Sequence, residues 1–151
     1  MSAQNSSKDL EGLLVVTVEQ AVAAPYTSCR LADAGARVIK VERPEGDFAR
    51  NYDSNALGNS AYFVWLNRGK ESIALDLKNK EDMEVFENII SKSDILIQNL
   101  APGAFERLGL DLKELRLKYP SLITCSISGF GDEGPYNCLL YTSPSPRDDG
   151  V

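Results

Sequence analysis

The side chains in this sequence that could do chemistry stand where short apolar runs end. Glu42 and Arg43 follow the β-branched stretch 37–41 and come directly before Pro44. An arginine fixed at a strand end could hold a phosphate group through two parallel hydrogen bonds. The alternative for Arg43 is a surface salt bridge with Glu42 or with Asp47, and the sequence leaves both interpretations open.

Three further polar side chains are candidates for ligand contacts. Lys78 and Arg107 could supply positive charge, and Asn99, just past the apolar run 95–97, could bond to an amide group of a ligand. The alternatives are a solvated lysine, an arginine that compensates a helix dipole and a turn-forming asparagine. Small residues within 21–24 would let the backbone approach a ligand closely. Together these residues indicate a ligand that carries phosphate.

Histidine is absent from the sequence, which removes the commonest general base, the Ser-His-Asp and Cys-His arrangements and most zinc sites. The three cysteines, Cys29, Cys125 and Cys138, are too widely spaced for a disulfide framework or a zinc pattern. We therefore expect no metal cofactor and a reducing compartment. Any covalent chemistry must use a carboxylate, cysteine, lysine or hydroxyl group.

A site for a nicotinamide dinucleotide is disfavoured. An acid at the end of the second strand, such as Glu42, is what a Rossmann site uses to bind the ribose. The turn after the first strand should then contain G-x-G-x-x-G, but residues 19–24 read EQAVAA, without a glycine. A P-loop motif is absent too.

The elements that must position these residues alternate between strands and helices. Apolar β-branched runs predict strands, and apolar residues at helical spacing predict helices. The alternation predicts an α/β fold with a Rossmann-like, open and mostly parallel sheet flanked by helices, whose ligands bind beyond the carboxyl ends of the strands. We expect strands at 13–18, 37–41, 72–77, 93–99 and 122–127, and helices at 22–34, 80–91, 102–108 and 111–118.

The segment 45–70 is predicted to be irregular, with a turn at 66–70. It contains an aromatic cluster at 62–65, with the sequence YFVW. We interpret this cluster as a plug of the hydrophobic core, because aromatic side chains bury large apolar areas. A stacking platform is the alternative.

The composition is typical of a single globular domain. The chain has 151 residues, of which 43% are hydrophobic, and a net charge of −6. This apolar content is enough to build a core, and the acidic balance without a basic stripe argues against binding to nucleic acid. No segment resembles a signal peptide or a membrane span. We therefore expect no membrane contact and a cytoplasmic location, or a mitochondrial one in a eukaryotic source.

The two ends of the chain differ from the predicted domain. Residues 1–9 are polar and are expected to be disordered. Residues 138–151 have no helical period, contain two prolines and resemble the translation of a sequencing-library adaptor. We interpret 138–151 as an artefact of sequence assembly, with a genuine disordered tail as the alternative. The predicted α/β region is therefore 10–137.

Residues 10–137 resemble the N-terminal part of the class III CoA-transferases, the formyl-CoA transferase and carnitine CoA-transferase family. The matching motifs follow one another in the order of that family. They are Leu10-Glu11-Gly12-Leu13, Ala24-Pro25, Leu31 to Ala36 with Val38 to Pro44, Gly46-Asp47, Asn67 with Lys70 and Ser72, Asp94 to Asn99 with Pro102-Gly103, and Ser126 to Gly131 with Gly134-Pro135-Tyr136.

The resemblance implies an enzyme that moves CoA from an acyl-CoA, such as succinyl-CoA, to a free carboxylic acid, and a homodimer of interlocked subunits at full length. In the family an aspartate attacks the thioester, so the reaction passes through an aspartyl intermediate. That aspartate lies beyond the motif at 134–136, and Asp132, Asp148 and Asp149 do not match it. We therefore expect a fragment that keeps the CoA-binding elements and is inactive by itself.

Within the family that the chain resembles, the motifs at 18–25 and 46–50 favour short dicarboxylic acids as acceptors. Two alternatives stay open, an α-methylacyl-CoA racemase-like member of the superfamily and a non-catalytic module that binds CoA or a nucleotide. The positions that match the CoA contacts of the family are Ala21, Val22, Arg43, Leu75, Lys78, Asn99, Leu100, Ala101 and Arg107.

Overall fold

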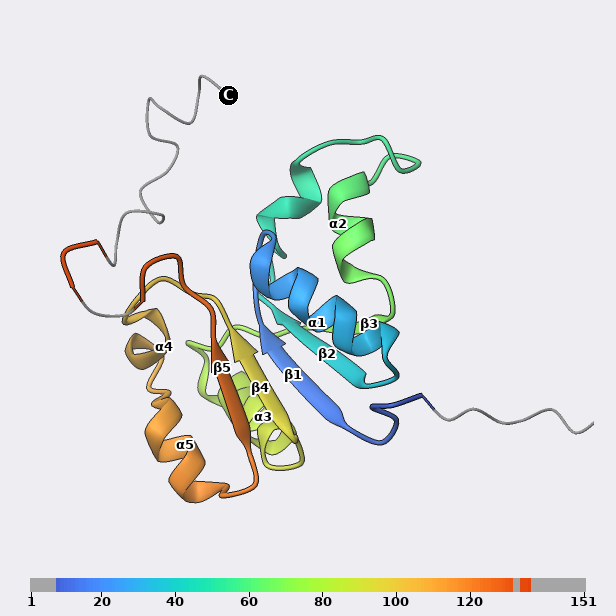
Figure 1. Ribbon diagram of the computed structural model, residues 1–151. Helices are drawn as coiled ribbons and strands as arrows, with labels where there is room; N and C mark the ends of the chain where they lie inside the picture. Colours follow the sequence, from blue (N-terminus) through green and yellow to red (C-terminus); the bar gives the residue numbers. More distant parts are fainter. Residues whose placement is uncertain (1–7, 132–133, 137–151) are drawn as a thin grey trace, which may run out of the picture.

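A five-stranded sheet with all strands parallel forms the centre of the computed structural model, which describes residues 8–131 and 134–136 (Figure 1). Helices flank the sheet, which confirms the predicted α/β class. Most of the expected N-terminal tail at 1–9, the expected artefact at 138–151 and Asp132 lie outside the described residues. The strands are β1 (Leu14–Val18), β2 (Arg37–Glu42), β3 (Lys70–Ala74), β4 (Ile95–Gln98) and β5 (Ile123–Ser126). The helices are α1 (Ala23–Asp33), η1 (Phe48–Asn51), α2 (Ala61–Asn67), α3 (Lys80–Ile90), α4 (Ala104–Arg107) and α5 (Leu112–Lys118).

The order of the strands in the sheet is β3-β2-β1-β4-β5. The chain builds β1 to β3 toward one edge and then crosses to β4 and β5 on the other side of β1. The direction of strand addition therefore reverses between β1 and β4. In open α/β sheets, ligands bind at such a switch point, beyond the carboxyl ends of the strands.

Two apolar layers cover the two faces of the sheet, because successive side chains of a strand point to opposite faces. Val16 and Val18 of β1 pack in one core cluster with Phe86 of α3. Val15 packs on the other face with Ala24 of α1. Figure 1 shows α1 in front of the sheet and α3 behind it. Burial on both faces explains why the strand sequences are rich in valine, isoleucine and leucine.

A side-chain cap begins one helix, and a glycine turn follows another. The side chain of Asp111 accepts hydrogen bonds from the backbone N–H groups of Lys113 and Glu114, so it caps the N-terminus of α5. Gly35 has a φ of +105°, which residues other than glycine rarely adopt. A Cβ atom at this position would also collide with the Lys8 side chain. Gly35 thus allows the sharp turn between α1 and β2.

The segment 45–70 is more ordered than the prediction, and its aromatic cluster is not a plug of the core. Residues 61–67 form α2, so their side chains point in several directions around a helix. Tyr62 and Trp65 are exposed at its surface, whereas Leu66 is fully buried. The prediction was wrong because an aromatic run was treated as one apolar unit, although helical spacing divides it between an inner and an outer side.

The strand β3 begins two residues earlier than predicted and ends at Ala74 instead of 77. Its first residue, Lys70, pairs with Val38 of β2 in the parallel register. The Lys70 side chain is buried against Glu19. The sequence analysis placed Lys70 in the turn at 66–70 because a lysine is usually exposed to solvent. This explains why the predicted start of β3 was two residues late.

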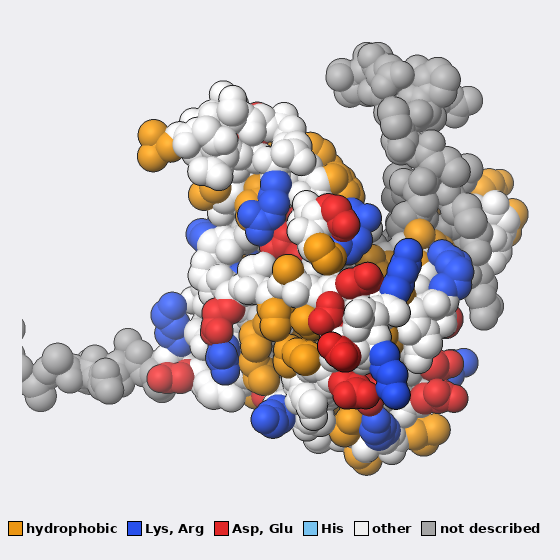
Figure 2. Space-filling view, turned by 180° about the vertical axis from the view of Figure 1, so that it is seen from behind, with side chains coloured by type: hydrophobic (Ala, Val, Ile, Leu, Met, Phe, Trp, Pro, Cys, Tyr) orange, Lys and Arg blue, Asp and Glu red, His pale blue; other side chains and the backbone are white. Residues whose placement is uncertain are grey.

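Acidic and basic side chains are intermingled on the face of the molecule that α3 covers (Figure 2). A protein that binds nucleic acid instead presents a continuous basic patch. Among the described residues, no helix combines the length and the apolar character that crossing a bilayer requires.

Candidate functional site

The predicted ligand-binding residues gather at the carboxyl edge of the sheet. All of them except Arg107 follow the carboxyl ends of β1, β2, β3 or β4. Parallel strands end at the same edge, so residues far apart in the sequence meet there. The structure divides these residues between two hollows, which we call the leucine cavity and the turn hollow.

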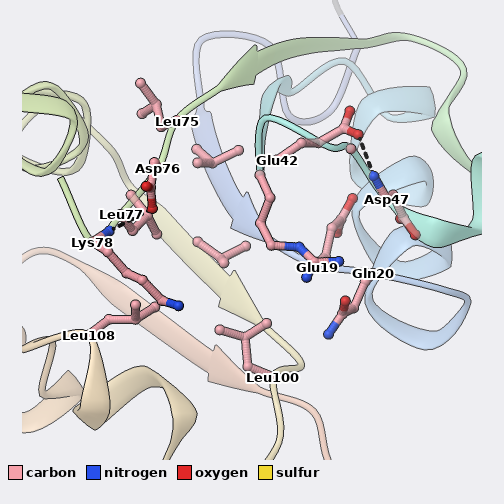
Figure 3. A pocket seen from close by; sticks show the side chains of 14 residues that line it. Glu19, Gln20, Glu42, Asp47, Leu75, Asp76, Leu77, Lys78, Leu100 and Leu108 are labelled. Carbon is pink, nitrogen blue, oxygen red and sulfur yellow. Dashed lines mark hydrogen bonds between the residues drawn. The ribbon is translucent and has the colours of Figure 1, made fainter.

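The leucine cavity has a volume of about 200 Å³ and lies beyond the ends of β1, β2 and β3 (Figure 3). Four of the predicted site residues line it, namely Arg43, Leu75, Lys78 and Leu100. Leu77 and Leu108, which were not predicted, add to its apolar wall. In Figure 3 the Lys78 side chain extends toward Leu100 and Leu108. Four acids also line it, Glu19, Glu42, Asp47 and Asp76. Apolar walls with two cations at the rim suit a flat apolar ring that carries anionic groups.

The turn hollow lies at the switch point of the sheet. Ala21, Val22 and Asn99 line it, together with the segment 127–129 that follows β5. Its wall consists largely of small side chains and backbone. Small side chains let an extended ligand chain approach the protein backbone closely, so a hollow of this kind can accept such a chain.

Two predicted residues belong to neither hollow. Ala101 follows Leu100, and its carbonyl accepts a hydrogen bond from the Ala104 N–H group. Arg107 is exposed at the end of α4, with its Nη1 atom 3.5 Å from the carbonyl oxygen of Pro102. Their contacts with a ligand stay predictions.

The side chain of Asn99 joins the end of β4 to the turn after β1. Its Oδ1 atom accepts from the Gln20 N–H group at 2.9 Å, and its Nδ2 atom donates to the Gln20 carbonyl at 2.9 Å. The side-chain amide therefore bonds the turn residue through both of its ends. These bonds reach a residue 79 positions away, so Asn99 fixes a distant turn and forms none of its own. A ligand contact of this residue stays a prediction.

The salt bridges considered for Arg43 do not form in the described part of the chain. Glu42 accepts two hydrogen bonds from Arg50 instead, at 2.9 and 2.7 Å. Asp47 pairs with Lys40, with 2.7 Å between Nζ and Oδ2. Arg43 itself is exposed beside the leucine cavity. Its guanidinium group is thus available to a ligand.

Glu42 is nearly fully buried in a cluster of donors. Burial alone would raise the pKa of its carboxyl group, but hydrogen bonds from Arg50, from Ser72 and from the Asp47 amide outweigh this effect and lower the pKa to about 2. Glu42 is therefore a structural anion that fixes the loop after β2. A role of this acid in binding a ribose is excluded by these contacts.

We expect the stability of the chain to fall in acid because of Glu42. The pKa of Glu42 is lower in the folded chain than the value of about 4.3 for an unfolded glutamate, so its stabilising contribution is complete above about pH 4.3 and is lost as the pH falls toward 2. The contribution is about 3 kcal/mol. Urea unfolding across this range measures it, and Glu42→Gln is expected to flatten the profile. Glu45→Gln, a change of an exposed neighbour, should keep the wild-type slope, and an unchanged slope in Glu42→Gln would contradict the assignment.

Two buried lysines, Lys40 and Lys70, extend this cluster toward the turn between β1 and α1. Lys70 Nζ lies 2.7 Å from Glu19 Oε1, and both side chains are at most 2% exposed. The Oδ1 atom of Asn67 accepts from Lys40 at 3.0 Å and from Lys70 at 3.1 Å. Burial lowers the pKa of the Lys70 ammonium group, and the attraction of Glu19 offsets only part of this effect. Lys40, Asp47, Asn67, Lys70 and Glu19 thus form one continuous network, which we call the buried ion network.

The sequence reasoning did not predict this network. It gave no role to Lys40, Asn67 and Lys70 and considered Asp47 only as a partner of Arg43, although all four lie in matched motifs. A signal was available, because Lys40 stands within the β-branched stretch 37–41. A charge in the middle of a buried strand requires a partner. The identity of that partner depends on tertiary contacts.

Comparisons with known proteins agree with the fold and with the motifs. The family model described as CoA-transferase family III matches residues 10–140. An acetyl-CoA:oxalate CoA-transferase of Acetobacter aceti is 43% identical over 126 residues, which cover 83% of this chain and 32% of that protein. The human succinyl-CoA:glutarate CoA-transferase is 35% identical over 136 residues, which cover 89% of this chain and 31% of that protein.

Solved structures give the same result. The crystal structure of a CAIB/BAIF family protein from Brucella suis matches with a TM-score of 0.80 and 40% identity, over 87% of this chain and 36% of that one. The chain spans about a third of the length of the curated relatives that it matches.

Proposed function

The chain belongs to CoA-transferase family III, and from this membership we propose that it supplies the coenzyme A-binding part of an enzyme that moves CoA from an acyl-CoA to a free carboxylic acid. The observation that carries the proposal is the arrangement of the leucine cavity, where Arg43 and Lys78 stand beside leucine side chains at the carboxyl edge of the sheet. This arrangement combines cations for phosphate groups with an apolar surface for an adenine ring.

We assign different parts of coenzyme A to the two hollows. The leucine cavity receives the phosphorylated adenosine, with Arg43 and Lys78 on its phosphates. The turn hollow receives the pantetheine arm, which is an extended chain with amide groups. The switch point between β1 and β4 lies beside both hollows, so a single ligand can occupy the two at once. The remaining predicted contacts, Ala101 and Arg107, lie on the segment that leads from β4 into α4.

The proposed reaction uses a carboxylate as nucleophile. A carboxylate is already ionised at neutral pH and needs no general base, which fits a sequence without histidine. The aspartate of the family attacks the acyl thioester and expels the CoA thiolate. The thiolate then attacks the aspartyl carbonyl of the resulting anhydride, which gives an aspartyl thioester and releases the donor carboxylate. The acceptor carboxylate attacks that thioester, and the freed thiolate attacks the acceptor carbonyl of the second anhydride, which gives the new acyl-CoA and regenerates the aspartate. No residue of this sequence matches that aspartate. The transfer therefore needs polypeptide outside this sequence, and we expect the chain alone to bind coenzyme A without transferring it.

The substrates proposed are succinyl-CoA as donor and a short dicarboxylic acid as acceptor. Several relatives have names of this kind, among them the succinate–glutarate CoA-transferase of Agrobacterium fabrum and the succinyl-CoA:mesaconate CoA-transferase of Haloarcula hispanica. The motifs at 18–25 and 46–50 favour the same class of acceptor. For the full-length protein we propose a homodimer.

Isothermal titration calorimetry tests the binding proposal. We expect saturable binding of coenzyme A to one site per chain, and weaker but measurable binding of adenosine bisphosphate, which lacks the pantetheine arm. The same chain incubated with succinyl-CoA and a dicarboxylate should form no new thioester. A chain that binds neither coenzyme A nor adenosine bisphosphate would contradict the proposal, and turnover by the chain alone would contradict the assignment of the nucleophile.

A further inference from the structure

The turn between β1 and α1 is fixed one residue at a time by side chains from other elements. The Glu19 carboxylate accepts from Lys70 Nζ at 2.7 Å. The next residue, Gln20, is held through its backbone by Asn99. The third residue, Ala21, donates its N–H group to Oδ1 of Asp47 at 3.3 Å. Three consecutive turn residues are therefore positioned by contacts that come from far along the chain.

Ala21 has the least favourable backbone conformation of these residues. Its φ is 62°, in the left-handed region that alanine rarely adopts. A residue keeps such a conformation only where its surroundings fix it. Val22, which follows, is the N-cap of α1 and makes no side-chain cap hydrogen bond. The conformation of Ala21 thus sets the path of the backbone into a helix whose start faces the turn hollow.

Asp47 holds Ala21 with a carboxylate that is closed to solvent, although the residue itself also lines the leucine cavity. Its side chain is 1% exposed, and its Oδ1 atom accepts from the N–H groups of Ala21 and Ala49. Its Oδ2 atom accepts from Lys40 Nζ. Every oxygen of the carboxylate is therefore bonded within the protein. None of these contacts leaves an oxygen directed at a bound molecule.

We propose that Asp47 is a positioning residue for coenzyme A binding: it keeps Ala21 in the left-handed conformation and so shapes the turn hollow for the pantetheine arm. The ligand named here rests on the proposed function, whereas the control of Ala21 by Asp47 does not. Lys40 holds the Asp47 carboxylate in place. The carboxylate of Asp47 then serves the site through its bonds to Ala21 and Lys40.

The test must remove charge and hydrogen bonding separately. Changing Asp47 alone would leave the Lys40 ammonium group buried without a partner, so Lys40 is replaced by methionine in both variants. Lys40→Met with Asp47→Asn keeps a side-chain oxygen that can accept from Ala21 and Ala49. Lys40→Met with Asp47→Leu removes that oxygen at similar volume. The two double variants thus differ in the side-chain amide, and only the asparagine variant keeps an acceptor for the N–H groups of Ala21 and Ala49.

Amide hydrogen exchange followed by NMR measures how well the Ala21 N–H group is protected, and it needs no ligand. We expect the exchange rate of the Ala21 amide to rise about five- to tenfold in the leucine variant, the value of one neutral hydrogen bond, and to stay near the wild-type rate in the asparagine variant. The amides of Phe86 and Leu96 in the core should exchange alike in both. Equal rates at Ala21 in the two variants would overturn the proposal.

Binding measurements then test the link to coenzyme A. Relative to the asparagine variant, the leucine variant should bind coenzyme A about five- to tenfold more weakly. Its affinity for adenosine bisphosphate should fall less, because the Asp47 carboxylate is closed to the leucine cavity that its residue lines. A merely structural role would lower both affinities together, and that result would also overturn the proposal. If the wild-type chain binds neither ligand, the proposed function fails, and the exchange rates still decide whether Asp47 positions Ala21.

Discussion

Replacing Lys70 by methionine is expected to lower the free energy of unfolding by about 3–5 kcal/mol. The Glu19 side chain is fully buried, and Lys70 is its only cationic partner in the described part of the chain, at 2.7 Å. Methionine has nearly the volume of lysine but no charge. The substitution therefore leaves a carboxylate in the interior whose remaining donor among the described residues is the Ser28 hydroxyl. Urea unfolding followed by circular dichroism measures the loss.

A matched control separates burial from the mere presence of an ion pair. Arg37 and Glu71 are also 2.7 Å apart, but their side chains are 62% and 57% exposed. Arg37→Met should therefore cost less than about 1 kcal/mol. Lys70→Met combined with Glu19→Gln should recover most of the stability, because no uncompensated charge remains. If Lys70→Met and Arg37→Met cost the same, the buried ion network would not be a determinant of stability.

The arrangement of the sheet could be predicted because each strand carries its own signal. Runs such as 13–18 and 95–97 are apolar on both faces, and Gly35 marks the break before the next strand. These signals are local, and the rule that ligands bind beyond the carboxyl ends of parallel strands then places Arg43 and Lys78 near each other. The structure confirms the fold and brings these two residues into one cavity.

The buried ion network could not be predicted because its bonds connect distant parts of the chain. Lys70 meets Glu19 across 51 positions, and Lys40 meets Asn67 across 27. A lone lysine in a sequence is most simply assigned to the surface, which misplaced the start of β3. Ala21 illustrates the same limit. No glycine in 19–24 signals a left-handed residue, yet Ala21 adopts that conformation, and its N–H group bonds to Asp47.

Replacing Arg43 by glutamine is expected to weaken the binding of coenzyme A about 10- to 100-fold, the value of a hydrogen bond to a charged group. Calorimetry on the wild-type and variant chains measures this change. Arg43→Lys should lie between the two, because lysine keeps the charge but not the planar fork that binds two phosphate oxygens. Raising the salt concentration should weaken coenzyme A binding by the wild-type chain more than binding by the glutamine variant. The stability should change by less than about 0.5 kcal/mol, since Arg43 is exposed.

The reason to expect a large effect from one exposed arginine is the state of its acidic neighbours. Glu42 is neutralised by Arg50 and Asp47 by Lys40, each across 2.7 Å, so neither acid competes with a phosphate for Arg43. Arg30→Gln is the control, because Arg30 is exposed on α1 and already bonds to Asp33. It should leave the affinity for coenzyme A unchanged. If Arg43→Gln bound coenzyme A as tightly as Arg30→Gln does, the phosphates would lie away from the end of β2, and the assignment of the leucine cavity to the phosphorylated adenosine would be wrong.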